Sequence, residues 1–347
     1  MSNTPLIVGL DDGHSAIKIY THPNPQDPLV KPIQFKMLSR GASGIKNMGS
    51  EDVINNQLIV VGDRVFTVLE SLTDFENTKN DEYQTSQLSK ALVYQALRLA
   101  NLPQRNVIIS AGLPVDKFYA NQRPNIQLIS EKKHNLLEMD GVYNKFDEAY
   151  SVPKIKIGNV KVLCEANAAF YDVLMDDNGE TTEIAKQYEL EDYGAAVLDI
   201  GGRTTDCVVV NPDGSLNARR SGTHNLGVLD LQDRVRSSLK NKHRLGHISE
   251  IALNKALITG KYGPIANQID ISEILAEEKQ ALFDGLDAFI KSTIGDSSDV
   301  PALILVGGGA YVLSDLIKEK YSNLIIPDDT EFSNARGFFK LMTYVLG

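Results

Sequence analysis

Residues 195–210 read AAVLDIGGRTTDCVVV, and this stretch of sequence indicates how the chain folds. A short apolar run ends at Asp199, a glycine pair makes a turn, and a second apolar run leaves from Asp206, which is the pattern of two strands joined by a tight loop. An ordinary hairpin needs neither the two threonines before Asp206 nor a carboxylate on each side of the turn. Glycine lets a phosphate approach consecutive backbone N–H groups without a Cβ in the way. The stretch therefore predicts a phosphate-binding loop.

The same plan occurs near the N-terminus. Leu6–Leu10 is an apolar run that stops at Asp11, Gly13 follows in the turn, and Ile17–Tyr20 alternates like a returning strand. Taken alone, this segment is better explained as an ordinary hairpin whose Asp-Gly pair makes the turn. In a functional interpretation Asp11 holds Mg²⁺ through water, because Mg²⁺ binds few carboxylates and keeps several waters, and Lys18 reaches the β- and γ-phosphates. The occurrence of one pattern in both halves favours the functional interpretation.

Two further segments carry residues suited to nucleotide chemistry. The apolar run Ala302–Val306 leads into Gly307–Gly309, which is either a flexible approach to a helix or a place where adenine or phosphate passes close to the backbone. Glu165 begins a predicted helix, where the helix dipole stabilises an acid whatever its role. It could also orient a water against a γ-phosphate, since phosphoryl transfer needs chiefly positioning and charge neutralisation. A P-loop of the G-x-x-x-x-G-K-[ST] type does not occur in the sequence.

Strands and helices alternate along the chain, which argues for an α/β architecture. At 347 residues there is room for two domains, each with its own core. The acidic stretch 176–192 is expected to be an exposed connection between the two halves. Besides the two loops, periodicity predicts a hairpin over 58–69, strands over 107–111 and 154–163, and helices over 88–99, 165–175, 226–239, 272–291 and 334–345.

Composition narrows the class of protein. Apolar residues make up 42% and charged residues 23%, as in ordinary soluble proteins, and the net charge of −10 argues against non-specific DNA or anionic-membrane binding. Cys164 and Cys207 lie in apolar runs, so we expect buried free thiols in a reducing compartment. Asp11 and Asp12 come too early for a signal peptide, and the uncharged stretch Ala302–Ser314 is too short to span a bilayer. We therefore expect a cytoplasmic protein.

In order and spacing, five segments resemble the motifs of the actin, DnaK-chaperone and sugar-kinase ATPase superfamily. The resemblance implies two actin-like, ribonuclease H-like domains with a nucleotide cleft between them. Domain I would cover 1–165, completed by the C-terminal helix 335–347, and domain II would cover 166–334. The five segments are the first phosphate motif Asp11–Lys18, the first connector Leu163–Tyr171, the second phosphate motif Leu198–Val209, the adenosine motif Val306–Val312 and the second connector Asn334–Phe338.

The same resemblance implies a role for each site residue. Asp11 and Asp199 would organise Mg²⁺, and Glu165 would act with Asp199 in catalysis by positioning the lytic water. The nucleotide would be ATP, with GTP left open. Arg203 stands where the chaperone branch has a third glycine, so its role is open. The implied nucleotide-binding residues are Asp11, Gly13, His14, Ser15, Ala16, Lys18, Gly201, Gly202, Arg203, Thr204, Gly307, Gly308 and Gly309.

Within the superfamily, the middle of the first half resembles the plasmid-segregation actin-like family ParM/StbA. The segments concerned are Leu113–Tyr119, Gln122–Asn125, Ile129–Lys133 and, later, Leu226–Val228. This resemblance implies an ATPase that polymerises head to tail into dynamic filaments on binding ATP. It would segregate plasmid DNA through a small DNA-bound adaptor, without its own sequence-specific DNA contact. The basic clusters Lys132–His134 and Lys240–Arg244 are expected to be solvated helix ends.

Three alternatives remain open from the sequence. A small-molecule, sugar-type kinase would need a catalytic Asp and a sugar pocket, and no persuasive candidate stands out. A chaperone would need a peptide-binding domain, for which the chain has no residues to spare. A membrane-attached division protein would need a basic amphipathic helix. From Phe338 onward, the last predicted helix offers Phe338, Phe339, Leu341, Met342 and Val345 with Lys340 as the only cation, so we expect it to pack on domain I rather than to bind a membrane.

Overall fold

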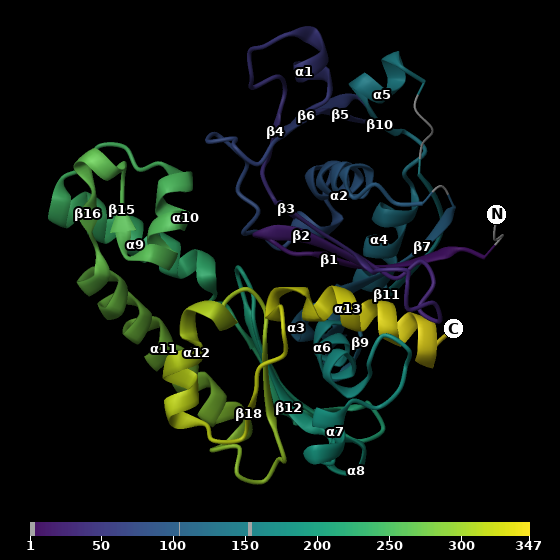
Figure 1. Cartoon of the computed structure of the whole chain (residues 1–347), viewed down its shortest axis with the longest axis vertical. Helices are drawn as coiled ribbons and strands as arrows, with labels where there is room; N and C mark the ends of the chain where they lie inside the picture. Colours follow the sequence, from purple (N-terminus) through teal and green to yellow (C-terminus); the bar gives the residue numbers. More distant parts are fainter. Residues whose placement is uncertain (1–3, 104, 152–154) are drawn as a thin grey trace. The chain divides into compact units, whose positions relative to one another are not determined.

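Two five-stranded mixed sheets organise the chain. The computed structural model describes residues 4–103, 105–151 and 155–347. By their internal contacts these residues divide into two compact units. The first unit contains the residues up to Gln187 together with Phe332–Gly347, and the second contains Tyr188–Glu331. Figure 1 shows the elements of both units along the sequence.

The sheet of the first unit has the order β11-β7-β1-β2-β3. β1, β2 and β3 form an antiparallel meander, and β1, β7 and β11 run parallel to one another. The predicted hairpin and strands are confirmed, although residue 154 of the strand predicted over 154–163 lies outside the described residues. The strands are β1 (Leu6–Asp12), β2 (Ala16–Thr21), β3 (Ile33–Leu38), β7 (Asn106–Leu113) and β11 (Lys156–Cys164).

The sheet of the second unit repeats this plan in the order β14-β13-β12-β17-β18. β12, β13 and β14 form an antiparallel meander, and β12, β17 and β18 are parallel. The repeat seen in the sequence therefore extends to the topology of a whole sheet. Its strands are β12 (Ala195–Ile200), β13 (Thr205–Val210), β14 (Leu216–His224), β17 (Leu303–Val306) and β18 (Leu324–Ile325), of which β14 and β18 were not predicted.

Helices cover both faces of the first sheet. Because side chains alternate along a strand, Val8 and Leu10 enter the core that contains α2 (Gln87–Leu99), whose first turn is capped by Ser86. On the opposite face Gly9 lies against α13 (Ser333–Lys340), which also packs on α6 (Glu165–Leu174). A second sheet in this unit, β10-β5-β6-β4, contains the predicted hairpin. The remaining strands and helices of the first unit, which include a separate two-stranded sheet β8-β9, are β4 (Gly41–Ser43), α1 (Glu51–Asn55), β5 (Leu58–Val61), β6 (Arg64–Val68), α3 (Val115–Phe118), β8 (Tyr119–Ala120), β9 (Arg123–Pro124), α4 (Ile126–Leu137), β10 (Val142–Asn144), α5 (Lys145–Ala149) and α7 (Glu183–Gln187).

A hydrophobic core of the second unit lies between its sheet and four longer helices. The long helix α11 packs on β13 and β14, and Leu282, Leu286 and Ile290 are its buried stripe. The helices predicted over 226–239 and 272–291 are confirmed as α9 and α11. The elements of this unit outside the sheet are α8 (Leu190–Tyr193), α9 (Val228–His243), α10 (Glu250–Thr259), β15 (Lys261–Tyr262), β16 (Ile269–Asp270), α11 (Ser272–Ile294) and α12 (Ala310–Lys320).

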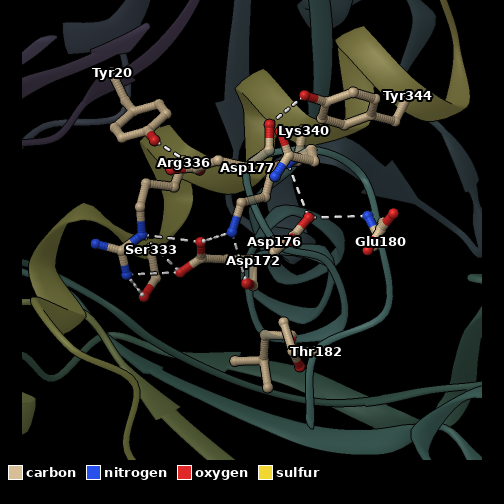
Figure 2. Close-up of polar contacts among 12 residues, drawn as sticks. Tyr20, Asp172, Asp176, Asp177, Glu180, Thr182, Ser333, Arg336, Lys340 and Tyr344 are labelled. Carbon is tan, nitrogen blue, oxygen red and sulfur yellow. Dashed lines mark hydrogen bonds and ion pairs between the residues drawn. The ribbon is translucent and has the colours of Figure 1, made fainter. Parts of the chain in front are cut away.

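The last helix returns to the first unit and is locked there by buried charges. Phe338 and Phe339 are buried, which confirms that this helix packs on the first domain. Asp172 of α6 is buried and accepts hydrogen bonds from Arg336 at 2.7 Å and from Lys340 at 2.8 Å (Figure 2). The carboxylate of Asp177 accepts a further bond from Tyr20 at 2.7 Å. The C-terminal helix is therefore a structural part of the first unit.

The contacts divide the chain at Gln187 and not at residue 165. α6 stays with the first unit because it lies against α13 so closely that a Cβ on Gly337 would overlap the carbonyl oxygen of Ala168. α7 follows because it packs on α6. The boundary between the two units falls inside 176–192, as expected for a connection between the halves, and most of this stretch is exposed or half-buried. Ala185 and Leu190 are nevertheless buried. Short apolar contacts of this kind leave no periodic signal in an acidic segment.

Candidate functional site

The first predicted phosphate loop lies between β1 and β2. Asp11 and Lys18 are directly opposite each other in the register of the two strands. The Lys18 ammonium donates to Asp11 Oδ2 at 2.7 Å, and both side chains are about nine-tenths buried or more. The Lys18 ammonium is thus held beside the loop, where β1 and β2 flank it.

The carbonyl groups of this loop are bonded to protein donors. Ser39 donates its hydroxyl to the carbonyl of Gly13 at 2.7 Å and its N–H to that of Ser15 at 3.0 Å. Thr78 donates its hydroxyl to the carbonyl of His14 at 2.7 Å. The His14 ring lies 2.6 Å from the carbonyl oxygen of Thr78 and packs on Tyr83. Carbonyl oxygens would repel a phosphate, so this anchoring leaves a loop suited to an anion.

The second predicted loop, between β12 and β13, is built in the same way. The N–H groups of Val228 and Leu229, at the start of α9, donate to the carbonyls of Gly201 at 3.1 Å and Gly202 at 2.9 Å. The approach requires Gly227, because a Cβ there would lie 2.6 Å from the carbonyl oxygen of Gly202. The start of α9 therefore holds the loop in place. This contact explains why a glycine stands in the segment 226–228.

Two carboxylates flank this second loop. Asp199 and Asp206 are opposite each other on neighbouring strands, and both are buried. Opposed carboxylates favour a cation nearby, because each raises the energy of the other's charged form. Asp206 also accepts a hydrogen bond from the hydroxyl of Thr223. Arg203 and Thr204 are partly exposed in the loop itself.

The glycine triplet packs against the second loop's strand. Gly307 has a φ of +85°, and a Cβ on it would overlap the carboxylate of Asp199. Gly309 donates its N–H to the carbonyl of Ile200 at 2.9 Å, and a Cβ on it would overlap the Ile200 side chain. Gly308 alone faces open space. The structure thus assigns two of the three glycines to packing and leaves one free to approach a ligand.

We expect substitutions in the triplet to separate folding from binding. Gly309→Ala should lower thermal stability, because the new methyl group must displace Ile200 or the backbone. Gly308→Ala should leave the melting temperature unchanged while altering nucleotide affinity. Thermal unfolding and nucleotide titration of both variants test this expectation. Equal destabilisation by the two substitutions would contradict it.

Glu165 lies at the same edge of the first sheet as the first loop. Parallel strands β1, β7 and β11 end together: Asp11–Asp12 and Gly112–Leu113 are the last residues of β1 and β7, and Glu165 directly follows β11. A Cβ on Gly112 would lie 2.8 Å from Cγ of Glu165, so the chain leaves room for this side chain. Within each unit, then, the predicted residues come together at one sheet edge: 11–18 with Glu165, and 199–206 with 307–309.

The residues present fit a magnesium ion held mainly through water. Among the described residues, no group of three or more His, Cys, Asp or Glu is arranged to enclose a metal. Mg²⁺ bound with a nucleotide does not need such a cage, since it takes one or two carboxylates, waters and the phosphates. Asp11 and Asp199 each offer a buried carboxylate beside a glycine turn.

Sequence reasoning missed the residues that support the first loop. Ser39, Thr78 and Tyr83 come from segments without a motif, and only the three-dimensional structure brings them to the loop. Lys132 was expected to be solvated, which is wrong: it is fully buried and donates to Asp12 at 2.7 Å. A signal existed, because Lys132 falls four residues after Leu128 and four before Leu136, on the apolar stripe of α4. The expectation of buried free thiols is confirmed for Cys164 and Cys207.

Comparison with protein families gives two adjacent matches. A family model described as the N-terminal part of plasmid segregation protein ParM matches residues 6–176. A model described as the C-terminal part of an archaeal MreB-like actin homologue matches residues 197–319. Comparison with curated proteins gives no match. The two family models thus match consecutive parts of the chain, the first within the first unit and the second within the second unit, and together cover most of both.

Solved structures match over nearly the whole length. A non-polymerisable quadruple mutant of pCBH ParM is 20% identical with a TM-score of 0.71, over 98% of this chain and 99% of that one. A ParM from a 15-stranded filament of Clostridium botulinum is 19% identical with a TM-score of 0.71, over 97% and 99%. The archaeal actin homolog Ta0583 in complex with ADP is 18% identical with a TM-score of 0.68, over 96% and 97%. At these sequence identities the matches show similarity of fold alone. Separately, none of the helices in the described part of the chain is long and apolar enough to span a membrane.

Proposed function

Since this chain belongs to the ParM-type actin-like proteins, with their fold of two actin-like domains, we propose that it is an ATPase that forms dynamic filaments and segregates plasmid DNA. One observation carries the proposal. In each unit the central strand has a buried aspartate, Asp11 or Asp199, as its second-last residue and is followed by a glycine-containing loop whose carbonyls are bonded to the protein. A loop prepared in this way suits the phosphates of a nucleotide.

Lys18 would be the first group to respond to the nucleotide. In the structure its ammonium bonds Asp11. Phosphate oxygens offer the same ammonium a more highly charged partner, so Lys18 would turn to the phosphates. Asp11 would then be released to hold the water shell of Mg²⁺, the role that we also propose for Asp199. When bound, Mg²⁺ neutralises charge on the phosphate oxygens.

Glu165 would hold the attacking water. It begins α6 directly after β11, whose last residue, Cys164, is buried and pairs with β7, so its backbone is fixed by the sheet and its side chain starts from a defined point. Phosphoryl transfer depends on such positioning, because there is little covalent chemistry for the protein to perform.

Assembly would be head to tail. A ParM of similar fold is described in a filament and another as a non-polymerisable mutant. Contacts between unlike faces of successive subunits do not close and so give filaments. ATP would favour the protomer shape that stacks, and hydrolysis would weaken the lattice. The net charge of −10 suits a chain that leaves DNA recognition to a small DNA-binding adaptor.

Filament formation is tested directly by electron microscopy and pelleting of the protein with ATP, with ADP and without nucleotide. We expect filaments with ATP and Mg²⁺ that disappear as ATP is consumed. GTP in place of ATP measures the nucleotide preference. A protein that hydrolyses ATP, forms no polymer at any concentration and phosphorylates a member of a sugar panel would refute the proposal in favour of a small-molecule kinase.

Asp11→Asn should weaken binding of the magnesium–nucleotide complex specifically. The substitution keeps the shape of the side chain but removes the charge that orients the water shell of the ion. Loss of such an indirect metal contact typically costs 10–100-fold in affinity, so we expect a loss of about that size with Mg²⁺ present. Titration in EDTA is the control, where wild type and variant should bind alike or the variant more tightly. An equal loss in both conditions would contradict a metal role for Asp11.

A further inference from the structure

A buried lysine lies under the first phosphate loop and has no part in the function proposed above. Lys132 is 0% exposed, although lysine side chains normally keep their charged end in water. Its ammonium donates to Asp12 Oδ1 at 2.7 Å and to the carbonyl oxygen of Gly112. One cation thus joins the ends of the neighbouring parallel strands β1 and β7.

Asp12 lies on the opposite face of β1 from Asp11. Adjacent residues of a strand point to opposite faces, so Asp11 faces Lys18 and Asp12 faces α4. Asp12 is 1% exposed, and its Oδ2 has no hydrogen-bond partner among the described residues. Burial raises the pKa of Asp12 and the attraction of Lys132 opposes that rise. The carboxylate therefore depends on Lys132 for its only side-chain hydrogen bond within the part of the chain that the structure describes.

Gly112 connects this ion pair to the proposed catalytic glutamate. Its carbonyl accepts from Lys132, while the side where a Cβ would stand faces Glu165 and Phe338. A shift of the end of β7 would therefore move Gly112, against which the side chain of Glu165 packs. The end of β1, held through Asp12, leads directly into the loop that begins at Gly13.

We propose that Lys132 is a positioning residue for hydrolysis, which fixes the first phosphate loop through Asp12 and Glu165 through Gly112. The inference rests on the function proposed above. Lys132 touches neither water nor nucleotide in this role, and acts only by holding two strand ends at a set separation. Displacement of a reacting group by about 1 Å can reduce a rate by about 10²-fold, so a small relaxation of these ends has a large effect on turnover.

Stability alone gives no reason for a charged pair at this place. Moving two charges out of water is costly, and apolar side chains of similar volume often stabilise a fold as well or better. A hydrogen-bonded cation, in contrast to apolar packing, fixes both distance and direction for two acceptors. The pair is therefore better explained by geometry than by stability.

Two variants separate positioning from folding. Lys132→Met keeps the length of the side chain and removes the ammonium. Asp12→Asn with Lys132→Met also removes the carboxylate, so no unpaired charge stays buried. Lys133→Met is the matched control, because Lys133 is the next residue, is exposed and loses the same charge. For each protein we would measure thermal unfolding, nucleotide affinity, and kcat and KM for ATP below the concentration at which polymers form.

We expect kcat to fall at least about tenfold in both Lys132 variants, with nucleotide affinity and KM within about threefold of wild type. The double variant should unfold near the wild-type temperature and still turn over slowly, and Lys133→Met should match wild type. A double variant with wild-type stability and wild-type kcat would overturn the inference and leave the ATPase intact. Absence of hydrolysis by the wild-type protein would overturn the proposed function, and the inference with it.

Discussion

Glu165→Gln should slow ATP hydrolysis by about 10²-fold or more while leaving nucleotide binding almost unchanged. The amide has the shape of the carboxylate but cannot accept a proton from the attacking water. Since polymerisation needs only the bound nucleotide, the variant should form filaments that persist long after wild-type filaments have disassembled. Phosphate release and pelleting over time, measured on the same samples, check both parts of this expectation.

The chain offers a matched control for this substitution. Glu183 is the first residue of α7, as Glu165 is of α6, so both carboxylates gain from a helix dipole. Glu183→Gln should lose the same small stabilisation and retain full hydrolysis. If Glu165→Gln and Glu183→Gln hydrolyse ATP equally well, Glu165 does not hold the water.

Asp172→Asn should strongly destabilise the first unit. The carboxylate is buried and is shared by Arg336 and Lys340, whose side chains are largely buried too (Figure 2). Removing one partner of a buried ion pair costs about 3–5 kcal/mol, because the remaining charge stays out of water without compensation. Urea unfolding followed by a probe in the first unit measures the loss. Asp74→Asn is the control, because the Asp74–Lys46 pair is exposed and so is screened by water.

The pH dependence of stability offers a second readout of the same cluster. Burial alone would raise the pKa of Asp172, but Lys340 and Arg336 together hold it below its usual range. The stabilisation is therefore complete above the unfolded-state pKa of about 3.9 and is lost as the pH falls through the lower folded-state value. Wild type and Asp172→Asn should differ most at neutral pH and converge in acid. A constant difference down to the acid limit would exclude this carboxylate as the source.

The hairpins and their loops were predictable because their signal is local. An apolar strand, a carboxylate, glycine and a second strand follow one another within a short segment, and each part has its own stereochemical reason. The assignment of α6 to the first unit was not predictable in the same way. α6 stays in the first unit because Gly337, far along the chain, allows α13 to approach Ala168. Contacts between distant segments of this kind have no counterpart in sequence periodicity.

Lys132 illustrates a different limit. Its position on the apolar stripe of α4 indicates burial, whereas a lysine in a basic cluster indicates exposure. The carboxylate that compensates its charge, Asp12, lies far away in the sequence, so no local pattern joins the two residues. The three glycines Gly307, Gly308 and Gly309 are equivalent in the sequence. Only the three-dimensional structure shows that Gly307 and Gly309 pack on β12, whereas Gly308 faces open space.

The return of α13 to the first sheet sets an order of events during synthesis. The second unit is one continuous segment, Tyr188–Glu331, and holds all the strands of its own sheet. It can fold as it leaves the ribosome. The first unit, begun earlier, must wait for Phe332–Gly347 to cover the face of β1 at Gly9. At synthesis rates of about 5–20 residues per second this delay lasts roughly 7 to 30 s, so the half of the protein that is made first is the half that is completed last.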